Sequence, residues 1–424
     1  MPSTPKRIHR EEYFEMRIAF ILLISLLLPN GARSAEPLPQ PSGSDFQVTS
    51  RLKANVDFWI RIYSHYGTRE GVVHDSRYID KVYEVLDFRG TEGRTSRQVL
   101  ASKRKWKSVL LSLHRKQSKP APLTEDEAKV FELYRDVPDS DKFLAAAHRK
   151  RVRFQLGQKD RFEEGLRLSG RYLVQMEEIF RQQGLPVELT RLPFVESSFN
   201  TRARSKVGAS GIWQFMRSTG RHFLRISDAV DERNDPILAT RAAAELLKLN
   251  YQSLGSWPLA VTAYNHGRQG MMRAVRRVGS ESLDDLIEGY RSRSFGFASS
   301  NFFACLLAAI EVERGAEKYL GKVQREPLHE FLEAPLPEAI RFRDLVKFMS
   351  LNPKEIMDLN PAFSSRVFSG EVMIPAGYLL RVPFDGKSGK DSAVEVFLAG
   401  YREIPVSFKK KSPGLRRAKA NRSQ

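Results

Sequence analysis

The segment 234–255 carries both a start signal and a stop signal for a single helix. Asp235 can cap the first turn, Pro236 suits the first helical position, and Gly255 is a typical stop. The residues between these signals are rich in alanine and leucine, which lets neighbouring helices approach closely. The chain therefore has to build a helical core around this segment.

Composition restricts the class of protein. The 424 residues are enough for two or three domains, and 41% hydrophobic content excludes a chain that is disordered throughout. Lys and Arg (69) exceed Asp and Glu (50), which gives a formal net charge of +19. The single cysteine, Cys305, cannot form an intramolecular disulfide or a cysteine metal cluster. Zinc, serine-nucleophile and phosphate-loop motifs are also missing from the sequence, so no metal or cofactor is expected.

Residues 1–35 resemble a secretory signal peptide. A basic start leads into the apolar run 18–28, followed by small residues up to Ala35. This run is too short to cross a bilayer as a helix, and no cysteine follows it to carry a lipid anchor. A buried helix is the alternative. We expect cleavage near Ser34 or Ala35 and a protein of the periplasm or cell wall.

The rest of the chain divides by pattern into segments. They are a linker at 36–45, a helical N-terminal region at 46–180, a compact helical region at 181–318, a small α+β module at 335–384 and a basic disordered tail at 405–424. Apolar residues spaced three, four or seven apart predict one long helix before Gly184; these are Phe162, Leu166, Leu173, Met176 and Phe180. Strands are expected at 372–374 and 379–382. Basic clusters at 103–119 and 148–153 are either solvated helix faces or a binding surface for a polyanion.

Glu196 is the candidate catalytic residue. It lies in an apolar and aromatic stretch, 192–199, which would desolvate its carboxyl group. Desolvation raises the pKa of a carboxyl group and keeps it protonated for donation to a leaving oxygen. A helical glutamate is more often an exposed or capping residue, so this signal alone is weak.

Aromatic and amide side chains follow Glu196 in two motifs. The glycine-rich stretch 208–216 contains Trp213 and Gln214, and 263–267 contains Tyr264 and Asn265. Sugars are held by stacking on aromatic faces and by hydrogen bonds to amides. These residues near one acid would form a saccharide cleft.

Residues 184–279 resemble the catalytic domain of the lytic transglycosylases of glycoside hydrolase family 23, relatives of goose-type lysozyme, and especially their type-D branch. The matching positions are Glu196-Ser197 for the Glu-Ser motif, Ser205 for a substrate-contacting serine, Gln214 and Met216 in the glycine-rich motif, and Tyr264-Asn265 in the Ala-Tyr-Asn motif. The resemblance implies a lysozyme-like helical domain that cleaves peptidoglycan glycan strands. It also implies that Glu196 acts alone with the substrate's N-acetyl group and leaves 1,6-anhydromuramic ends.

The resemblance departs from the family pattern at one motif. Where the family has a glutamate and a tyrosine, this chain has Ala298 and Phe302. The alternatives are therefore a peptidoglycan-binding protein without turnover, or a hydrolytic lysozyme. The module 335–384 resembles a peptidoglycan-binding LysM domain, with a plain α+β packing domain as the alternative.

The net charge also suggests partners. A basic protein suits a substrate that carries carboxylates and phosphates, and it permits peripheral contact with anionic wall polymers or a membrane surface. Nucleic acid is not expected, because the chain has a predicted signal peptide and no recognisable nucleic-acid module. The sequence does not identify the protein partners.

Overall fold

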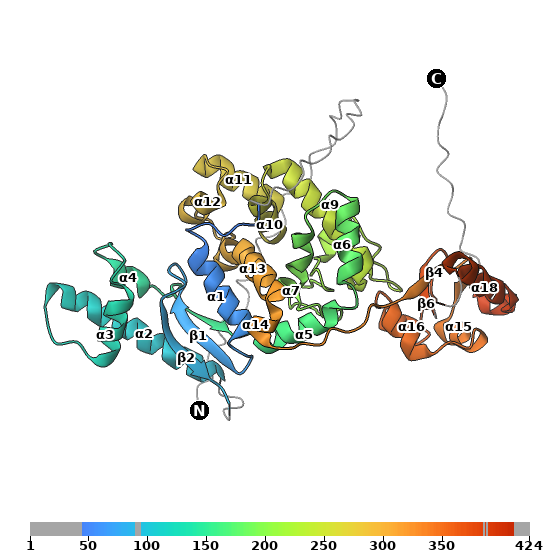
Figure 1. The fold of residues 1–424 in the computed structure, drawn as a ribbon, viewed down its shortest axis with the longest axis horizontal. Coiled ribbons are helices and arrows are strands. Elements are labelled where there is room, and N and C mark those ends of the chain that lie inside the picture. The colour runs from blue at the N-terminus through green and yellow to red at the C-terminus, as the bar shows by residue number, and fades with distance from the viewer. Residues whose placement is uncertain (1–44, 90–94, 385, 387–388, 411–424) are drawn as a thin grey trace, which may run out of the picture. The chain divides into compact units, whose positions relative to one another are not determined.

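The computed structural model describes residues 45–89, 95–384, 386 and 389–410. The predicted signal peptide, nearly all of the predicted linker and residues 411–424 of the predicted tail lie outside this part. The described chain is mostly helical, as predicted (Figure 1). None of its helices is both long and apolar enough to cross a membrane.

The N-terminal region contains a sheet that the helical prediction missed. Strands β1 (Glu70–Asp75), β2 (Val82–Asp87) and β3 (Val152–Leu156) pair antiparallel in the order β2-β1-β3. β3 joins β1 from far along the chain, with Val73 opposite Phe154. Three short strands separated in this way leave little period-two signal in the sequence, so the spacing of apolar residues predicts helices throughout this region.

Four helices belong to the same region: α1 (Lys53–Ser64), α2 (Thr95–Ser118), α3 (Glu125–Leu133) and α4 (Lys142–Ala146). One hydrophobic cluster joins α2, α3 and α4 to the sheet, with Trp106, Tyr134 and Phe143 among its buried members. Beside this cluster, Arg151 forms an ion pair with the fully buried Asp75. The basic cluster 103–119 lies on α2 and the segment that follows it.

The single long helix expected before Gly184 is two helices, α5 (Lys159–Ser169) and α6 (Leu173–Gln182). The break falls at Gly170, where a Cβ atom would lie 2.1 Å from the carbonyl oxygen of Glu326. The apolar residues of the predicted face are all buried, so their assignment to the core is correct; they are Phe162, Leu166, Leu173, Met176 and Phe180. The helix therefore ends where a distant segment packs closely against it, and the buried face continues across the break.

The region around Glu196 is built from short and long helices. They are η1 (Val187–Arg191), α7 (Leu192–Glu196), α8 (Arg217–Gly220), η2 (Glu232–Asn234), α9 (Pro236–Leu254), α10 (Trp257–His266), α11 (Arg268–Val278), α12 (Leu283–Gly289), α13 (Phe297–Arg314) and α14 (Ala316–Leu320). The signals that bound α9 act as predicted. The Asp235 carboxylate accepts hydrogen bonds from the backbone of Ile237 and Leu238, and Gly255 ends the helix at φ 68°. α13 is largely buried and contacts α1, α7 and α10.

The C-terminal region has mixed structure. Its elements are β4 (Phe331–Pro335), β5 (Ala339–Ile340), α15 (Phe342–Phe348), α16 (Pro353–Leu359), α17 (Ser365–Phe368), β6 (Leu379–Pro383), α18 (Lys390–Glu403), η3 (Val406–Phe408) and β7 (Lys409–Lys410). β6 matches the strand expected at 379–382, whereas 372–374 contributes only an isolated bridge, from Ile374 to Ile340. β7 pairs with β5, so residues 409–410 belong to this fold rather than to a disordered tail.

Candidate active site

Glu196 is the last residue of α7. Pro193 lies in the first turn of this short helix, and Leu192 and Phe194 anchor it in the core. The half-buried Glu196 side chain lines a cavity of about 920 Å³. The α7 sequence therefore places one carboxyl group at the wall of a space large enough for sugar rings.

The surroundings of Glu196 favour its protonated form. Burial raises the pKa of Glu196 to about 8. Within the described residues its carboxyl group has no ion pair or hydrogen bond. Tyr63, Tyr264 and Cys305 lie close enough that the charge of Glu196 raises the pKa of each, although burial is the larger cause. A carboxyl group whose charged form is desolvated in this way is protonated at neutral pH and can donate a proton.

The backbone after Glu196 has an uncommon conformation. Ser198 and Phe199 have φ values of 51° and 57°, in the left-handed region that side chains disfavour. Two features hold them: Phe199 is fully buried, and the Ser197 hydroxyl donates to the Ile212 carbonyl over 2.8 Å. This turn leads the chain directly out of α7 and along the cavity wall.

Gln214 lies in the same cavity as Glu196 and also has a positive φ, 47°. Its side-chain amide donates to the carbonyls of Gly211, over 2.8 Å, and Ala203, over 3.2 Å. Both donor positions of the amide are thereby engaged. Its carbonyl oxygen has no partner among the described residues and is available as an acceptor.

Trp213 does not form the exposed stacking platform that the sequence suggested. The indole is 0% exposed, lies parallel to Phe180, and donates to the Thr240 hydroxyl over 2.9 Å. Tyr264 also contacts this residue, since its hydroxyl donates to the Trp213 backbone carbonyl. Trp213 is therefore a core residue that supports the turn containing Gln214.

Ser205 and Met216 line a neighbouring cavity of about 600 Å³ rather than the one at Glu196. Arg204 borders both cavities. The Ser205 hydroxyl accepts a hydrogen bond from the backbone of Ala209, and Met216 is 40% exposed. The predicted site residues Gln214, Ser205 and Met216 are thus divided between two adjacent cavities.

The motif that departs from the family pattern lies on α13. Ala298 is exposed, whereas Phe302 is buried and stacks parallel to Tyr264. Between them, the Ser299 hydroxyl donates to the side-chain carbonyl of the exposed Asn265 over 2.9 Å. The last turn of α10 is therefore fixed to α13 by one hydrogen bond and one ring contact.

Two acidic residues that sequence reasoning missed share the cavity with Glu196. Asp160 and Glu164 both come from α5. Desolvation acts to raise the pKa of the exposed Asp160, but hydrogen bonds from the backbone and hydroxyl of Thr68 lower it overall. The hydrogen bond and ion pair with Arg167 lower the pKa of Glu164. No sequence signal marked either residue, because both lie on the polar face of an ordinary amphipathic helix. In the described ranges, no group of three or more His, Cys, Asp or Glu side chains is arranged to hold a metal ion.

Comparison with known proteins identifies the class of this region. Residues 176–287 match the family described as "Transglycosylase SLT domain". The chain is 40% identical over 98 residues to membrane-bound lytic murein transglycosylase D of Escherichia coli K12, and 33% identical over 113 residues to a putative tributyltin chloride resistance protein of Alteromonas sp. M-1. These segments make up 23% and 26% of this chain, and 22% and 55% of the respective relatives. The protein thus contains an SLT domain homologous to that of transglycosylase D.

Solved structures of lytic transglycosylases give looser matches. An inactive mutant of Slt from Pseudomonas aeruginosa aligns with 57% of this chain and 36% of its own, at 17% identity and a TM-score of 0.30. The 70 kDa soluble transglycosylase of Escherichia coli aligns with 53% and 37%, at 18% identity and a TM-score of 0.27. The assignment of the domain therefore depends on the sequence matches.

Proposed function

We propose that this protein is a lytic transglycosylase that cleaves the β-1,4 bond between N-acetylmuramic acid and N-acetylglucosamine. The observation that carries the proposal is the carboxyl group of Glu196. It lies in a cavity of about 920 Å³, and burial raises its pKa to about 8. Its position in the SLT-matched segment supports the same role.

In the proposed reaction Glu196 acts twice. It first protonates the bridging oxygen as the bond to the muramyl C1 breaks, while the acetamido carbonyl of the same sugar bonds to C1. The resulting Glu196 carboxylate then takes the proton of the C6 hydroxyl, whose oxygen displaces the acetamido group. Glu196 ends protonated, no water is consumed, and the product carries a 1,6-anhydro ring.

The other predicted residues would bind substrate. The free carbonyl oxygen of Gln214 would accept from a sugar amide or hydroxyl. The side-chain NH2 group of the exposed Asn265 would donate to a sugar oxygen beside α13. Ser205 and Met216 would contact more distant sugars, because they line the neighbouring cavity. The C-terminal module would bind peptidoglycan as a LysM-like domain, in an exported protein of the cell envelope.

The nearest alternative is a hydrolytic lysozyme, because Asp160 and Glu164 place further carboxylates in the cavity of Glu196. Against it, both Asp160 oxygens accept hydrogen bonds from Thr68, and both Glu164 oxygens accept from Arg167. These bonds lower the pKa of both carboxylates, which makes each a weaker base for an attacking water. The second alternative, a wall-binding protein without turnover, follows from Ala298 and Phe302.

The test is digestion of purified peptidoglycan by residues 36–424, with mass analysis of the released fragments. Glu196→Gln and Asp160→Asn are assayed beside the unaltered protein. The proposal requires products lighter by one water than lysozyme products, absent from Glu196→Gln and retained by Asp160→Asn. Reducing-end products lost in Asp160→Asn would establish hydrolysis. Binding to sacculi without any product would establish a non-catalytic protein.

A further inference from the structure

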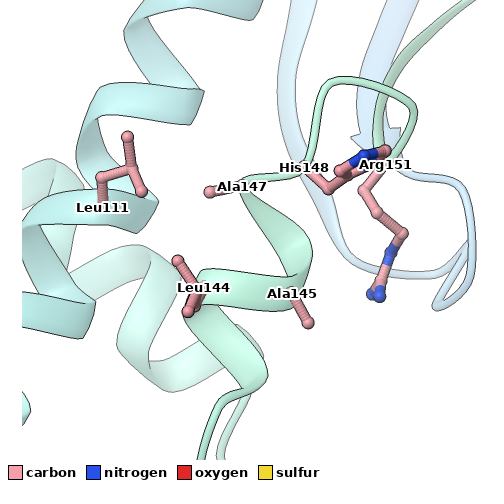
Figure 2. Close-up of a pocket in the computed structure, with 6 residues that line it drawn as sticks. All are labelled: Leu111, Leu144, Ala145, Ala147, His148 and Arg151. Atoms are coloured by element: carbon pink, nitrogen blue, oxygen red, sulfur yellow. The ribbon is translucent and has the colours of Figure 1, made fainter.

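A separate pocket lies in the N-terminal region, between α2, α4 and the turn 148–151 (Figure 2). Its volume is about 560 Å³. The lining residues are Leu111, Leu144, Ala145, Ala147, His148 and Arg151, none of which borders the cavity of Glu196. Four of these six side chains are aliphatic, so the pocket offers an apolar surface open to solvent.

The helix that supplies Leu111 has no acidic residue along its whole length. Helical spacing places five residues of α2 on one face, here called the cationic stripe; they are Leu100, Arg104, Lys107, Leu111 and Arg115. The three cations are exposed, and within the described residues they form no ion pair or side-chain hydrogen bond. Arg149 and Lys150, exposed on the turn, also lack ion pairs there.

Two other cations of α2 are neutralised. Lys105 forms an ion pair with Asp126 of α3, and Lys116 forms one with Glu127. Each lies on the side of the helix that faces α3, away from Leu111. The helix therefore divides into a paired side, which holds the fold together, and an unpaired stripe beside the pocket.

Arg151 lines the pocket but adds no uncompensated charge to it. Its guanidinium group binds the buried Asp75 carboxylate through two nitrogens, so its charge is compensated. The apolar lining is accessible to solvent, since Leu144 is 44% exposed. An apolar pocket beside uncompensated cations complements a ligand that combines one apolar group with several carboxylates.

We propose that this surface binds an acidic segment of a partner protein, with one apolar side chain in the pocket and carboxylates along the cationic stripe. Arg104 and Arg115 are separated along α2 by about 16 Å, which a helical peptide of about three turns would span. The concave pocket favours a protein segment over a bilayer, because a flat lipid surface leaves such a pocket unfilled. This inference is independent of the chemistry proposed for Glu196.

The probe is a fluorescein-labelled peptide of about 15 residues, rich in glutamate, with one central leucine. Binding of this peptide to residues 36–424 is measured by fluorescence anisotropy at low salt. Ala145→Trp fills the pocket without changing charge and should weaken binding at least about fivefold. Arg104→Glu with Arg115→Glu should weaken it more than about tenfold. Leu144→Ser, at an exposed position, tests the pocket again if Ala145→Trp fails to fold.

The matched control is Arg276→Glu with Arg277→Glu on α11, which makes the same charge change at exposed positions elsewhere. It should change the affinity less than about twofold. Replacing the central leucine of the peptide with serine should abolish the effect of Ala145→Trp. The proposal is overturned if the control weakens binding as much as the stripe variant, or if neither pocket variant changes it. Tighter binding of vesicles of phosphatidylglycerol and phosphatidylcholine, or of duplex DNA, than of the peptide would also overturn it.

Discussion

The Tyr264 hydroxyl donates a hydrogen bond to the carbonyl oxygen of Trp213 over 2.7 Å. This bond joins α10 to the turn that presents Gln214 to the cavity. The ring of Tyr264 also lies parallel to Phe302 of α13, with centroids 6.3 Å apart and planes 6° apart. Tyr264 thus connects two walls of the site, and its hydroxyl is already engaged.

Tyr264→Phe should lower the free energy of unfolding by about 1–2 kcal/mol, because the Trp213 carbonyl loses its partner. Urea unfolding at pH 7 measures the change. Tyr251→Phe is the control, since the Tyr251 ring stacks on Trp257 and its hydroxyl has no hydrogen-bond partner in the described chain. Equal losses in the two variants would show that the bond to Trp213 contributes nothing specific.

The rate of peptidoglycan cleavage should fall as pH rises through about 8. Glu196 has to be protonated to donate, and burial raises its pKa to that value. Release of soluble fragments between pH 5 and 10, under saturating substrate, gives the profile. A rate already halved near pH 5 would mean that the proton donor has an ordinary carboxyl pKa, and so is not the buried Glu196.

Glu196→Gln should stabilise the protein at high pH and leave its stability unchanged at low pH. The folded state holds the Glu196 proton up to about pH 8, whereas the unfolded chain releases it near 4.5. The contribution of Glu196 to the free energy of unfolding is therefore fully present below about pH 4.5. It falls by on the order of 5 kcal/mol as the pH rises to about 8. Glutamine does not ionise, so the melting temperatures of the two proteins should diverge between these pH values. Parallel curves across the range would contradict a buried, neutral Glu196.

Asp235→Asn should destabilise the protein by about 3–5 kcal/mol, because it removes the one fully buried carboxylate that compensates a buried guanidinium. Arg381 of β6 donates to Asp235 over 2.6 Å, and both side chains are almost fully buried. Asparagine also caps helices well, so the variant keeps the cap of α9. The change in the free energy of unfolding then reports the loss of the Asp235 charge. Chemical denaturation followed by circular dichroism gives the value.

The control for this prediction is Glu333→Gln. Glu333 is the other carboxylate bound by Arg381, over 3.0 Å, but its side chain is 40% exposed. Its loss should cost less than about 1 kcal/mol, because solvent screens the pair. If both variants lower the free energy of unfolding by the same amount, burial is not the reason for the strength of the Asp235–Arg381 ion pair.

Local signals predicted the parts of this fold that depend on few neighbours. Asp235 and Gly255 bound α9 as expected, because capping bonds and a left-handed glycine act within one turn. The apolar stretch around Glu196 correctly indicated a desolvated carboxyl group, since Phe194 and Phe199 are buried beside it. Signals of this kind lie in adjacent residues and survive without any tertiary contact.

Other features arise only when distant segments meet. β3 pairs with β1 across three intervening helices, and the backbone at Glu326 packs against Gly170, where the helix ends although the apolar pattern continues. Trp213 suggested an exposed ring, but neighbours from α6 and α9 enclose it. Burial depends on which elements pack together, and spacing along one segment does not contain that information.

The sequence by itself determined a mostly helical protein with an SLT-type segment and one conspicuous acid, Glu196. Only the tertiary structure decided what surrounds that acid: the cavity, the nearby Tyr63 and Cys305, and the two carboxylates of α5. It also decided that α2 has an unpaired stripe of cations beside an apolar pocket. The physical reason is the same in both cases, because pKa values and binding surfaces depend on distances through space between residues far apart in the chain.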